Sequence, residues 1–282
     1  MKIKNIIGQL FNEGVTHSKE IKYEGLVGGT VSDSYLLRDG NVKYVLKISD
    51  PRKIKAEATF LERYEESILL PRLLFVEASN TYLVYSFLEG QTNHASSNKQ
   101  AFLKILVKEL LNNYIAVSSS CGWGWINEPT DSWKEFLLSE VKESKKYISS
   151  RLDESNHKLV LDVISRMSND RDRYLLHGDC GVHNFIFESS QLRGVIDPDP
   201  LVGDPLYDLL YAFCSSPKDL TKEVIDSSVG PLKNKKNRGS SLYEEVLISL
   251  YIRLGRSVRH HPEDLEAYLT SWAYWVRIVK GV

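Results

Sequence analysis

The chain has 282 residues, of which 42% are hydrophobic and 26% are charged, with a formal net charge of -1. This composition is ordinary for a folded globular protein, and the length allows one large domain or two lobes that each bury a core. The near balance of 36 basic and 37 acidic residues gives no general attraction to nucleic acid or to an anionic membrane. We therefore expect neither a nucleic-acid partner nor a membrane partner.

The cysteines and the N-terminal segment bear on location. Cys121, Cys180 and Cys214 are widely spaced and odd in number, which suits a reducing compartment better than a disulfide framework. Gly8 and Gln9 interrupt the apolar stretch near the N-terminus, so it lacks the continuous apolar region of a signal peptide. No stretch approaches the roughly 18 to 20 apolar residues of a membrane span. These features predict a cytoplasmic protein.

The first ninety residues have the pattern of an antiparallel β-sheet with one helix. Apolar residues recur at helical spacing from about Lys53 to Glu66. Glycine-containing or polar turns separate runs of β-prone residues, which lie at 21–29, 31–38, 42–49, 73–78 and 81–87. We therefore predict a β-rich N-terminal lobe over residues 1–90.

The rest of the chain, residues 91–282, is mainly helical in pattern. A polar segment at 91–100 opens it as a hinge or a surface loop. Between Tyr174 and Ile196 the pattern returns to short strands, which we expect to form a hairpin around 189–191. Helical patterns cover 101–117, 133–152, 153–167, 242–258 and 263–280. The predicted fold class is α+β, with an antiparallel β-rich N-lobe and a mainly helical C-lobe.

Chemically active side chains are densest between Leu175 and Leu209. Asp179 and Asn184 are five residues apart in a loop that leads into the first strand of the hairpin, and Asp197 ends its second strand. The hairpin can therefore bring Asn184 and Asp197 together. Their oxygen atoms suit Mg²⁺, which usually keeps water and substrate phosphate in its other positions. Asp179 is then free to orient or deprotonate an attacking hydroxyl group, which is the division of roles that phosphoryl transfer requires.

The segment HGDCGVHN at 177–184, together with Asp197, resembles the catalytic loop and the metal-binding aspartate of the aminoglycoside phosphotransferase and choline kinase-like family. The resemblance extends over about 24–213. It implies a two-lobed protein kinase-like fold with ATP and Mg²⁺ as cofactors. It also implies that Asp179 is the catalytic base and that Asn184 and Asp197 are the metal ligands.

The same resemblance implies a nucleotide site in the N-terminal lobe. The loop that contains Gly28 and Gly29 takes the place of the nucleotide-covering loop between the first two strands. Lys47, in YVLKI, corresponds to the lysine that contacts the α- and β-phosphates. Glu57, in KAEATFL, corresponds to the ion-pair partner of that lysine, although other glutamates on the same predicted helix leave the partner open.

Two further segments fit the family's pattern. In TYLVYSFLEG, the Ser86 carbonyl group and the Leu88 amide group correspond to the backbone groups that meet adenine in the connection between the lobes. In GDPLYDLLYAF, Asp208 corresponds to a residue that braces the catalytic loop and takes no part in the chemistry.

Other interpretations of these residues are open. His177, Asp179 and His183 form an HxDxxxH pattern that could bind zinc or iron, as in a metal-dependent hydrolase. That interpretation leaves Asn184, Asp197 and the N-terminal lobe unexplained, and His177 is better understood as a structural residue of the loop. His183 either contacts substrate or is merely exposed. An inactive nucleotide-binding module is a further alternative, although such a module needs none of the catalytic side chains.

Two features favour a small acceptor over a protein acceptor. Gly178 stands where regulated protein kinases carry an arginine, and only ten residues separate Asp197 from Asp208. An aminoglycoside is the expectation from the family, but residues 205–282 hold nine acidic and eleven basic residues, without the acidic surplus that suits a polycation. Choline, homoserine, a sugar and a glycated amine remain open. We therefore predict transfer of the γ-phosphate of ATP to a hydroxyl group of a small molecule.

Overall fold

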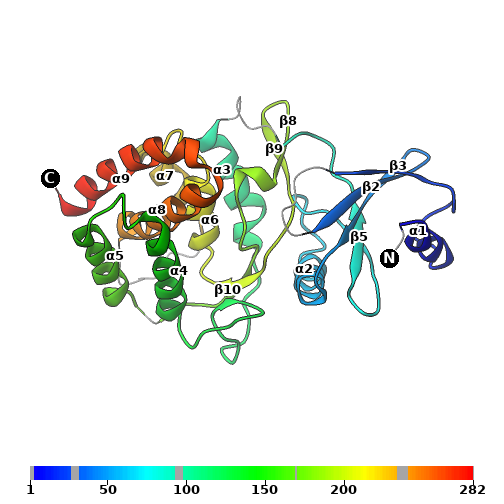
Figure 1. Ribbon diagram of the computed structural model, residues 1–282, viewed down its shortest axis with the longest axis horizontal. Helices are drawn as coiled ribbons and strands as arrows, with labels where there is room; N and C mark the ends of the chain where they lie inside the picture. The colour runs from blue at the N-terminus through cyan, green and yellow to red at the C-terminus, as the bar shows by residue number, and fades with distance from the viewer. Residues whose placement is uncertain (1–2, 27–31, 93–97, 169, 234–240, 282) are drawn as a thin grey trace.

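The protein has two lobes that follow one another along its long axis, with a β-sheet in one and most of the helices in the other (Figure 1). The predicted α+β fold class is confirmed. The computed structural model describes residues 3–26, 32–92, 98–168, 170–233 and 241–281.

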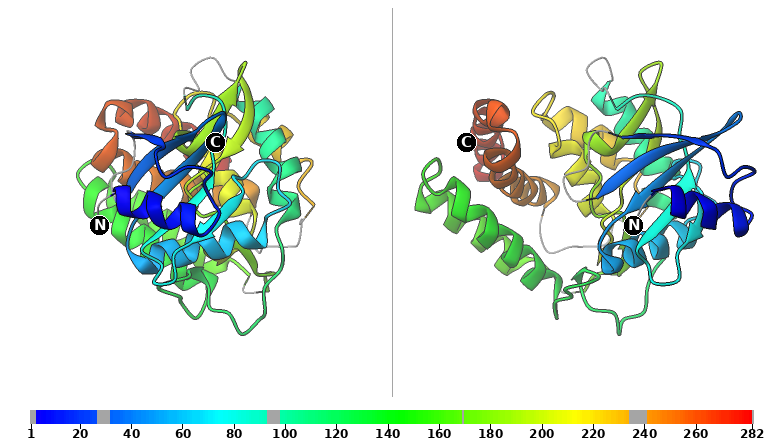
Figure 2. Two further views of the ribbon diagram at one scale, coloured as in Figure 1. Left: turned by 90° about the vertical axis from the view of Figure 1, so that its right-hand side faces the viewer. Right: turned by 45° about the vertical axis from the view of Figure 1, so that its right-hand side comes forward.

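The N-lobe is a five-stranded antiparallel sheet in the order β1-β2-β3-β5-β4. Helices α1 (Ile3–Asn12) and α2 (Pro51–Arg63) belong to the same lobe, and α1 lies across one face of the sheet (Figure 2). The strands are β1 (Lys22–Gly25), β2 (Asp33–Asp39), β3 (Val42–Ile48), β4 (Leu73–Val76) and β5 (Tyr82–Ser86).

Alternate residues of β3 contact different helices, because successive side chains of a strand point to opposite faces of the sheet. Tyr44 and Leu46 pack in one hydrophobic cluster with α1, whereas Val45 packs in another with α2. Lys47 follows Val45 by two residues and therefore points to the α2 face. The sheet register thus directs a charged side chain toward a buried helix face.

Helix α2 begins at Pro51, two residues before the predicted start. The Asp50 side chain accepts the backbone N–H of Arg52 and so caps the helix, and the fixed φ of proline suits the first helical position. These two residues explain the earlier start, because the apolar spacing used for the prediction begins only at Ala56.

The C-lobe contains seven α-helices among the described residues and two small antiparallel sheets. One sheet is the predicted hairpin of β8 (Phe185–Glu188) and β9 (Gln191–Val195). The other has the order β6-β10-β7, with β6 (Gly124–Trp125), β10 (Leu201–Gly203) and β7 (Tyr174–Leu176). The helices are α3 (Lys99–Glu109), α4 (Trp133–Ile148), α5 (Glu154–Arg166), α6 (Leu206–Cys214), α7 (Lys222–Val229), α8 (Leu242–His260) and α9 (Leu265–Lys280).

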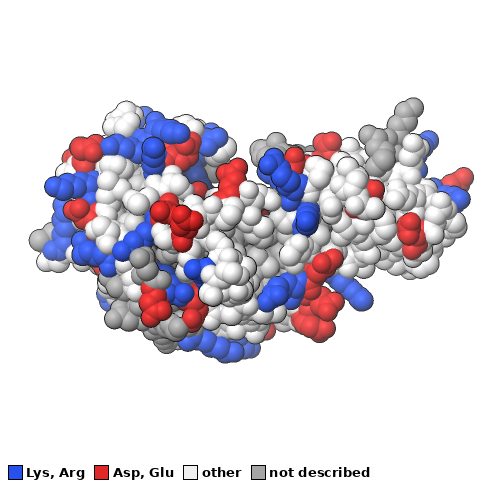
Figure 3. Space-filling model, turned by 90° about the horizontal axis from the view of Figure 1, so that it is seen from below, with Lys and Arg blue, Asp and Glu red and all other residues white. Residues whose placement is uncertain are grey.

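Helix α8 packs against α4, α5, α6 and α9, so it lies at the centre of the helical core. Among its buried residues are Tyr251 and Arg253, which makes this core partly polar. Among the described residues, no helix is both long and apolar enough to cross a membrane. Acidic and basic side chains are interspersed over the face shown in Figure 3.

Several elements differ from the sequence-based expectation. Helix α3 ends at Glu109 and gives way to a 3-10 turn at Leu111–Asn113, whereas the apolar pattern continued to about residue 117. The pattern does not indicate α6, which is buried along almost its whole length and so lacks a polar face. Strand β6 has two residues, too few for alternation to be visible.

Candidate active site

Lys47 and Glu57 form a buried ion pair between β3 and α2. The Nζ atom of Lys47 lies 2.7 Å from Oε2 of Glu57. Glu57 follows Ile54 by three residues and precedes Leu61 by four, so it shares their buried face of the helix. Glu62, by contrast, is exposed. The ion pair that the family resemblance implied is therefore present, with Glu57 as the partner.

The ammonium group of Lys47 also reaches the C-lobe, where its Nζ atom donates to Oδ1 of Asp197 at 2.9 Å. Burial by itself lowers the pKa of Lys47, but the negative charges of Glu57 and Asp197 outweigh burial and raise this pKa above its ordinary value. Lys47 is therefore positively charged. Two of its three N–H donors face these carboxylates, and the third is left for another ligand.

The loop that follows β7 is held in place by Asp208 of α6. The Asp208 carboxylate accepts the backbone N–H groups of His177 at 2.9 Å and of Gly178 at 3.1 Å. The hydroxyl group of Tyr114 donates to the same carboxylate at 2.6 Å. Because Asp208 is fully buried and bonds to the backbone of the loop, it braces the loop, as the resemblance implied.

Gly178 gives a direct test of how tightly this loop is packed. Its φ is +81°, and a Cβ atom there would lie 1.9 Å from the carbonyl oxygen of Asp199. We expect Gly178→Ala to lower the free energy of unfolding by about 3 kcal/mol or more, because left-handed strain and a steric clash add together. Gly40→Ala is the matched control, since Gly40 has a φ of +62° but no atom within 4 Å of the added Cβ. Equal losses for the two variants in urea unfolding would contradict the clash.

Asp179 accepts hydrogen bonds on both carboxylate oxygens. The Tyr211 hydroxyl group donates to Oδ1 at 2.5 Å, Nδ2 of Asn184 donates to Oδ2 at 2.9 Å, and Nε2 of His183 lies 3.3 Å from Oδ2. Burial by itself raises the pKa of Asp179, but the hydrogen bonds from His183 and Tyr211 outweigh it and lower this pKa below its ordinary value. The group is therefore a carboxylate and a weak base, which is better suited to orienting a hydroxyl group than to removing its proton early.

His177 lies beneath the loop and is completely buried. Its Nε2 atom lies 3.1 Å from the Ile196 carbonyl oxygen, and its Nδ1 atom accepts the backbone N–H of Asp179 at 3.3 Å. Both ring nitrogens are thus engaged within the loop. Burial lowers the pKa of His177 to about 4, so the ring is neutral near pH 7.

The neutral state of His177 should make the fold sensitive to acid. In the unfolded chain this side chain takes up a proton near pH 6.5, whereas in the folded protein it does so only near pH 4. The stability that His177 contributes is therefore present above pH 6.5 and is lost, by about 3 kcal/mol, as the pH falls to 4. His177→Asn should lack this part of the pH dependence in urea unfolding at a series of pH values. Parallel pH profiles for the variant and the wild type would contradict a buried neutral imidazole.

Asn184 and Asp197 lie at the open end of the β8–β9 hairpin, where the N–H of Ile196, the residue before Asp197, donates to the carbonyl oxygen of Asn184 at 2.9 Å. The Asn184 amide nitrogen is turned toward Asp179, and the Asn184 Oδ1 atom accepts no hydrogen bond from any part of the chain that the structure describes. An unused amide oxygen beside a carboxylate is a donor set of the hard type that Mg²⁺ prefers. These two side chains therefore fit a magnesium ion.

A cleft of about 970 Å³ is lined by residues of both lobes and contains this cluster. On its N-lobe side lie Val45 and the segment from Ser86 to Leu88, and on its C-lobe side lie Asn184 and Asp197. The backbone N–H of Leu88 donates to none of the described residues and is free to bind a ligand. The arrangement combines a cation, two hard oxygen ligands and an oriented carboxylate beside one large cleft.

Comparison with known families decides what this arrangement is. The sequence matches the profile of the phosphotransferase enzyme family (APH) over residues 22–228, which is well over half of the chain. The chain belongs to this family. Its members are small-molecule kinases that use ATP with Mg²⁺ and a hydroxyl acceptor. Among curated proteins, no sequence matches the chain.

Solved structures show the same fold at low sequence identity. A thermostable mutant of the aminoglycoside phosphotransferase APH(4)-Ia has a TM-score of 0.65 and 17% identity over 97% of this chain and 99% of that chain. A Ralstonia eutropha protein, provisionally assigned as an aminoglycoside phosphotransferase, has a TM-score of 0.68 and 11% identity over 98% of both chains. A Haemophilus somnus protein, provisionally assigned as a fructosamine-3-kinase, has a TM-score of 0.62 and 17% identity over 98% of this chain and 96% of that chain. At these identities the likeness shows the fold alone.

The site residues predicted for this phosphotransferase fall into three groups. Gly28 and Gly29 lie outside the described residues. Ser86 and Leu88 line the N-lobe side of the cleft and, among the described residues, form no hydrogen bond with the charged side chains of the site. The remaining five form two contacting groups: Lys47 pairs with Glu57 and Asp197, and Asn184 bonds to Asp179, while the backbone of Ile196, the residue before Asp197, bonds to Asn184.

Tyr211 is a partner of Asp179 that was not predicted from the sequence. Tyr211 follows Asp208 by three residues on α6, so both side chains lie on the helix face that meets the catalytic loop. The spacing of three residues from Asp208 could have indicated that Tyr211 faces the catalytic loop. This spacing has that meaning only if residues 206–214 are helical, which the sequence pattern did not predict.

The alternative interpretation of His177, Asp179 and His183 as a zinc or iron site is wrong. Both ring nitrogens of His177 are engaged with backbone groups. Within the part of the chain that the structure describes, no group of three or more His, Cys, Asp or Glu side chains could hold a metal ion. Cys180 is buried and its pKa is raised by burial, so it is no nucleophile either.

Proposed function

We propose that the protein transfers the γ-phosphoryl group of ATP to a hydroxyl group of a small molecule, with Asp179 as the base. The observation that carries this proposal is that two hydrogen-bonded pairs, Lys47 with Asp197 and Asn184 with Asp179, come together beside the cleft between the lobes, because Asn184 and Asp197 line the same cleft. An inactive nucleotide-binding module would not require an oriented carboxylate in that arrangement. We also infer that the lobes divide near residue 90.

The N-lobe residues would bind the nucleotide. Lys47 is held by Glu57 and keeps one N–H donor for the α- and β-phosphates. The free N–H of Leu88 and the carbonyl group of Ser86 would meet adenine at the opposite end of the cleft. Gly28 and Gly29 stay a prediction for the loop that covers the nucleotide.

Asn184 and Asp197 would hold Mg²⁺ through the amide oxygen and the carboxylate. Bound there, the ion would offset the negative charge of the transferring phosphoryl group. Lys47, which would position the phosphates, donates a hydrogen bond to Asp197, which would bind the metal. This bond links the two roles directly.

Asp179 would align the acceptor hydroxyl group. Its Oδ2 atom faces two donors, whereas its Oδ1 atom faces Tyr211 alone among the described residues and keeps a lone pair for the acceptor. As the acceptor oxygen bonds to the γ-phosphorus, the bond between that phosphorus and the leaving oxygen of ADP breaks, and the hydroxyl proton passes to Asp179. Because the lowered pKa makes this carboxylate a weak base, most of the rate would come from alignment and electrostatic stabilisation.

Aminoglycosides are the first acceptors to test. The solved relatives include APH(4)-Ia in complexes with hygromycin B and either ADP or AMP-PNP. The fructosamine-3-kinase relative adds glycated amines, and choline, homoserine and sugars complete the panel. The cytoplasmic location expected from the three cysteines also stays a prediction.

The proposal is tested by acceptor-dependent release of ADP in the presence of Mg²⁺. We expect at least one acceptor of the panel to raise ADP release well above the rate without acceptor, and removal of Mg²⁺ with a chelator to abolish it. ATP binding without any acceptor-dependent turnover would favour an inactive nucleotide-binding module instead.

A further inference from the structure

Arg253 is a buried cation at the C-lobe end of the cleft. It belongs to α8, and only 9% of the residue is exposed. Its Nε atom donates to the Tyr268 hydroxyl group at 2.9 Å, and that hydroxyl group donates to the Cys214 carbonyl oxygen at 2.9 Å. The base of the guanidinium group is therefore fixed in position by two neighbouring helices.

Among the described residues, the terminal amino groups of Arg253 have no hydrogen-bond or ion-pair partner, and the guanidinium group lies over the ring of Tyr268, 5.3 Å from its centroid. Within the described ranges, no carboxylate lies within 4.0 Å of this side chain, and no hydrogen bond is formed beyond the one at Nε. The other two arginines of this core differ, because Arg256 pairs with Glu140 at 3.0 Å and Arg171 pairs with Glu245 at 3.0 Å. A buried charge is costly unless it is paired, so an unpaired guanidinium group in a cleft indicates an anionic ligand.

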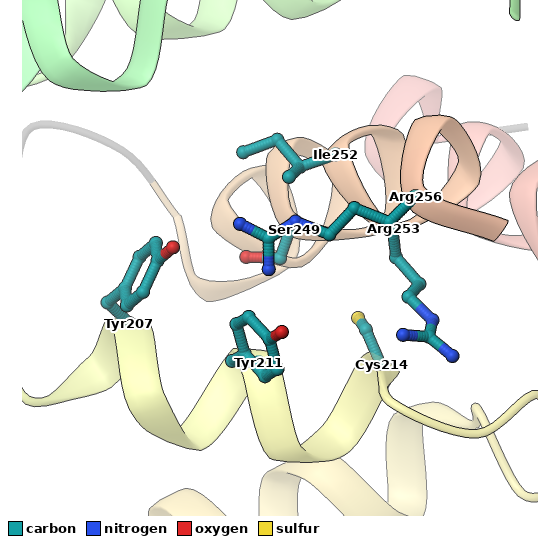
Figure 4. A pocket seen from close by; sticks show the side chains of 7 residues that line it. All are labelled: Tyr207, Tyr211, Cys214, Ser249, Ile252, Arg253 and Arg256. Atoms are coloured by element: carbon teal, nitrogen blue, oxygen red, sulfur yellow. The ribbon is translucent and has the colours of Figure 1, made fainter. Parts of the chain in front are cut away.

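Arg253 lines two cavities that also contain neighbours of Asp179. Arg253 lines the large cleft together with His183 and Asn184. It also lines a smaller pocket between α6 and α8 together with Tyr211, whose hydroxyl group donates to Asp179. In Figure 4 the guanidinium group of Arg256 points toward Tyr211, whereas that of Arg253 extends past Cys214 in a different direction.

A purely structural role does not account for the charge of Arg253. The carbonyl groups at the C-terminal end of α6 already have a hydrogen-bond donor, because Nζ of Lys99 donates to the Phe213 and Ser216 carbonyl oxygens at 2.9 and 2.8 Å. Asp264 lines the same end of the cleft but forms no ion pair with Arg253. Ser216 lines it as well, and its hydroxyl group forms no hydrogen bond to a described residue.

We propose that Arg253 binds an anionic group of the acceptor, so that the substrate is a small hydroxyl compound with a carboxylate or a phosphate group. This inference rests on the proposed function and names the class of its acceptor. A planar guanidinium group with both terminal amino groups free can bind either anion through two hydrogen bonds. A polycationic acceptor would instead bring its charges next to Arg253, whose repulsion would oppose the attraction of Asp264 in the same cleft.

The test compares matched acceptors that differ in the anionic group. One series is glycerol, glycerate and glycerol phosphate, and a larger series is fructose, gluconate and fructose phosphate, with hygromycin B as the polycation. We expect kcat/KM for an anionic member to exceed that of its neutral counterpart by at least about tenfold. The carboxylate and phosphate arms distinguish the two sources of the anion.

Three variants separate ligand binding from structure. Arg253→Met should remove the preference for the anion mainly through KM, and Arg253→Lys should restore part of it. Tyr268→Phe removes the hydrogen-bond partner of Nε but keeps the guanidinium charge, so it should retain the preference. Arg259→Met is the control, because Arg259 is an exposed arginine of the same helix that lies over Tyr147.

The outcomes distinguish this inference from the proposed function. Turnover of hygromycin B or of the neutral compounds, at rates equal to those of the anionic ones, overturns the inference and leaves the kinase assignment intact. If no acceptor is turned over, binding decides: the anionic compounds should raise the midpoint of thermal unfolding of the wild type more than that of Arg253→Met. Equal shifts for the two proteins overturn the inference, whereas the lack of turnover counts against the proposed function.

Discussion

Asp179→Asn should reduce acceptor-dependent turnover by about a thousandfold or more while changing the affinity for ATP only slightly. The variant keeps the size of the side chain but loses the negative charge that orients the acceptor hydroxyl group and receives its proton, a role that contributes about 10² to 10⁴ in rate. Asp179 contacts Tyr211, His183 and Asn184 and does not contact Lys47, so the phosphate-binding side of the cleft should be unaffected. Steady-state ADP release and calorimetric titration with ATP measure the two effects.

Asp162→Asn is the matched control for this experiment. Asp162 is exposed on α5, outside the catalytic loop, and the same chemical change there should leave turnover at the wild-type level. Full activity of Asp179→Asn would remove the catalytic role of this carboxylate. An equal loss of ATP affinity would instead assign Asp179 to the nucleotide site.

Lys47→Met should lower both stability and the affinity for ATP. Removal of the ammonium group leaves Glu57 buried without its cation, and breaking a buried ion pair from one side costs about 3 to 5 kcal/mol of the free energy of unfolding. The lost contact to the phosphates should weaken nucleotide binding by about tenfold to a hundredfold, because hydrogen bonds to charged groups contribute about 1.5 to 3 kcal/mol.

Lys43→Met on the same strand is the control for Lys47→Met. Lys43 pairs with Glu89 at 2.7 Å on the surface, where an ion pair contributes between about 0 and 1 kcal/mol. The double variant Lys47→Met with Glu57→Gln separates the two effects further. It should recover stability, since no unpaired charge is left, but it should not recover nucleotide binding. A Lys47→Met protein as stable as Lys43→Met would contradict the buried pair.

The sequence predicted those parts of the site that lie on one local element. The β8–β9 hairpin follows from two β-prone runs around a polar turn, and the bond between Ile196 and Asn184 at its open end places Asp197 one residue beyond that pair. Lys47 could be placed on a strand from its neighbours alone. The pairing of Lys47 with Glu57 depends on two patterns at once. Strand alternation must point Lys47 toward α2, and helix periodicity must place Glu57 on the buried face of α2; in the structure both conditions are met.

Contacts between distant segments could not be read from local patterns. Tyr211 meets Asp179 across 32 positions of sequence through the packing of α6 on the catalytic loop. The β6-β10-β7 sheet joins strands of two and three residues from three separate regions of the chain. Only the packing of α8 against α4 and α9 shows that Arg256 is neutralised by Glu140 while Arg253 is left without a carboxylate.

The most direct test of the kinase assignment is to follow the terminal phosphate of ATP into product. The protein is incubated with γ-labelled ATP, Mg²⁺ and each acceptor of the panel, and the products are separated and identified by mass. We predict a labelled phosphate ester on an acceptor hydroxyl group for the wild type and for Asp162→Asn, and none for Asp179→Asn. Label that appears only as inorganic phosphate, or label transfer that Asp179→Asn performs as well as the wild type, would contradict the account.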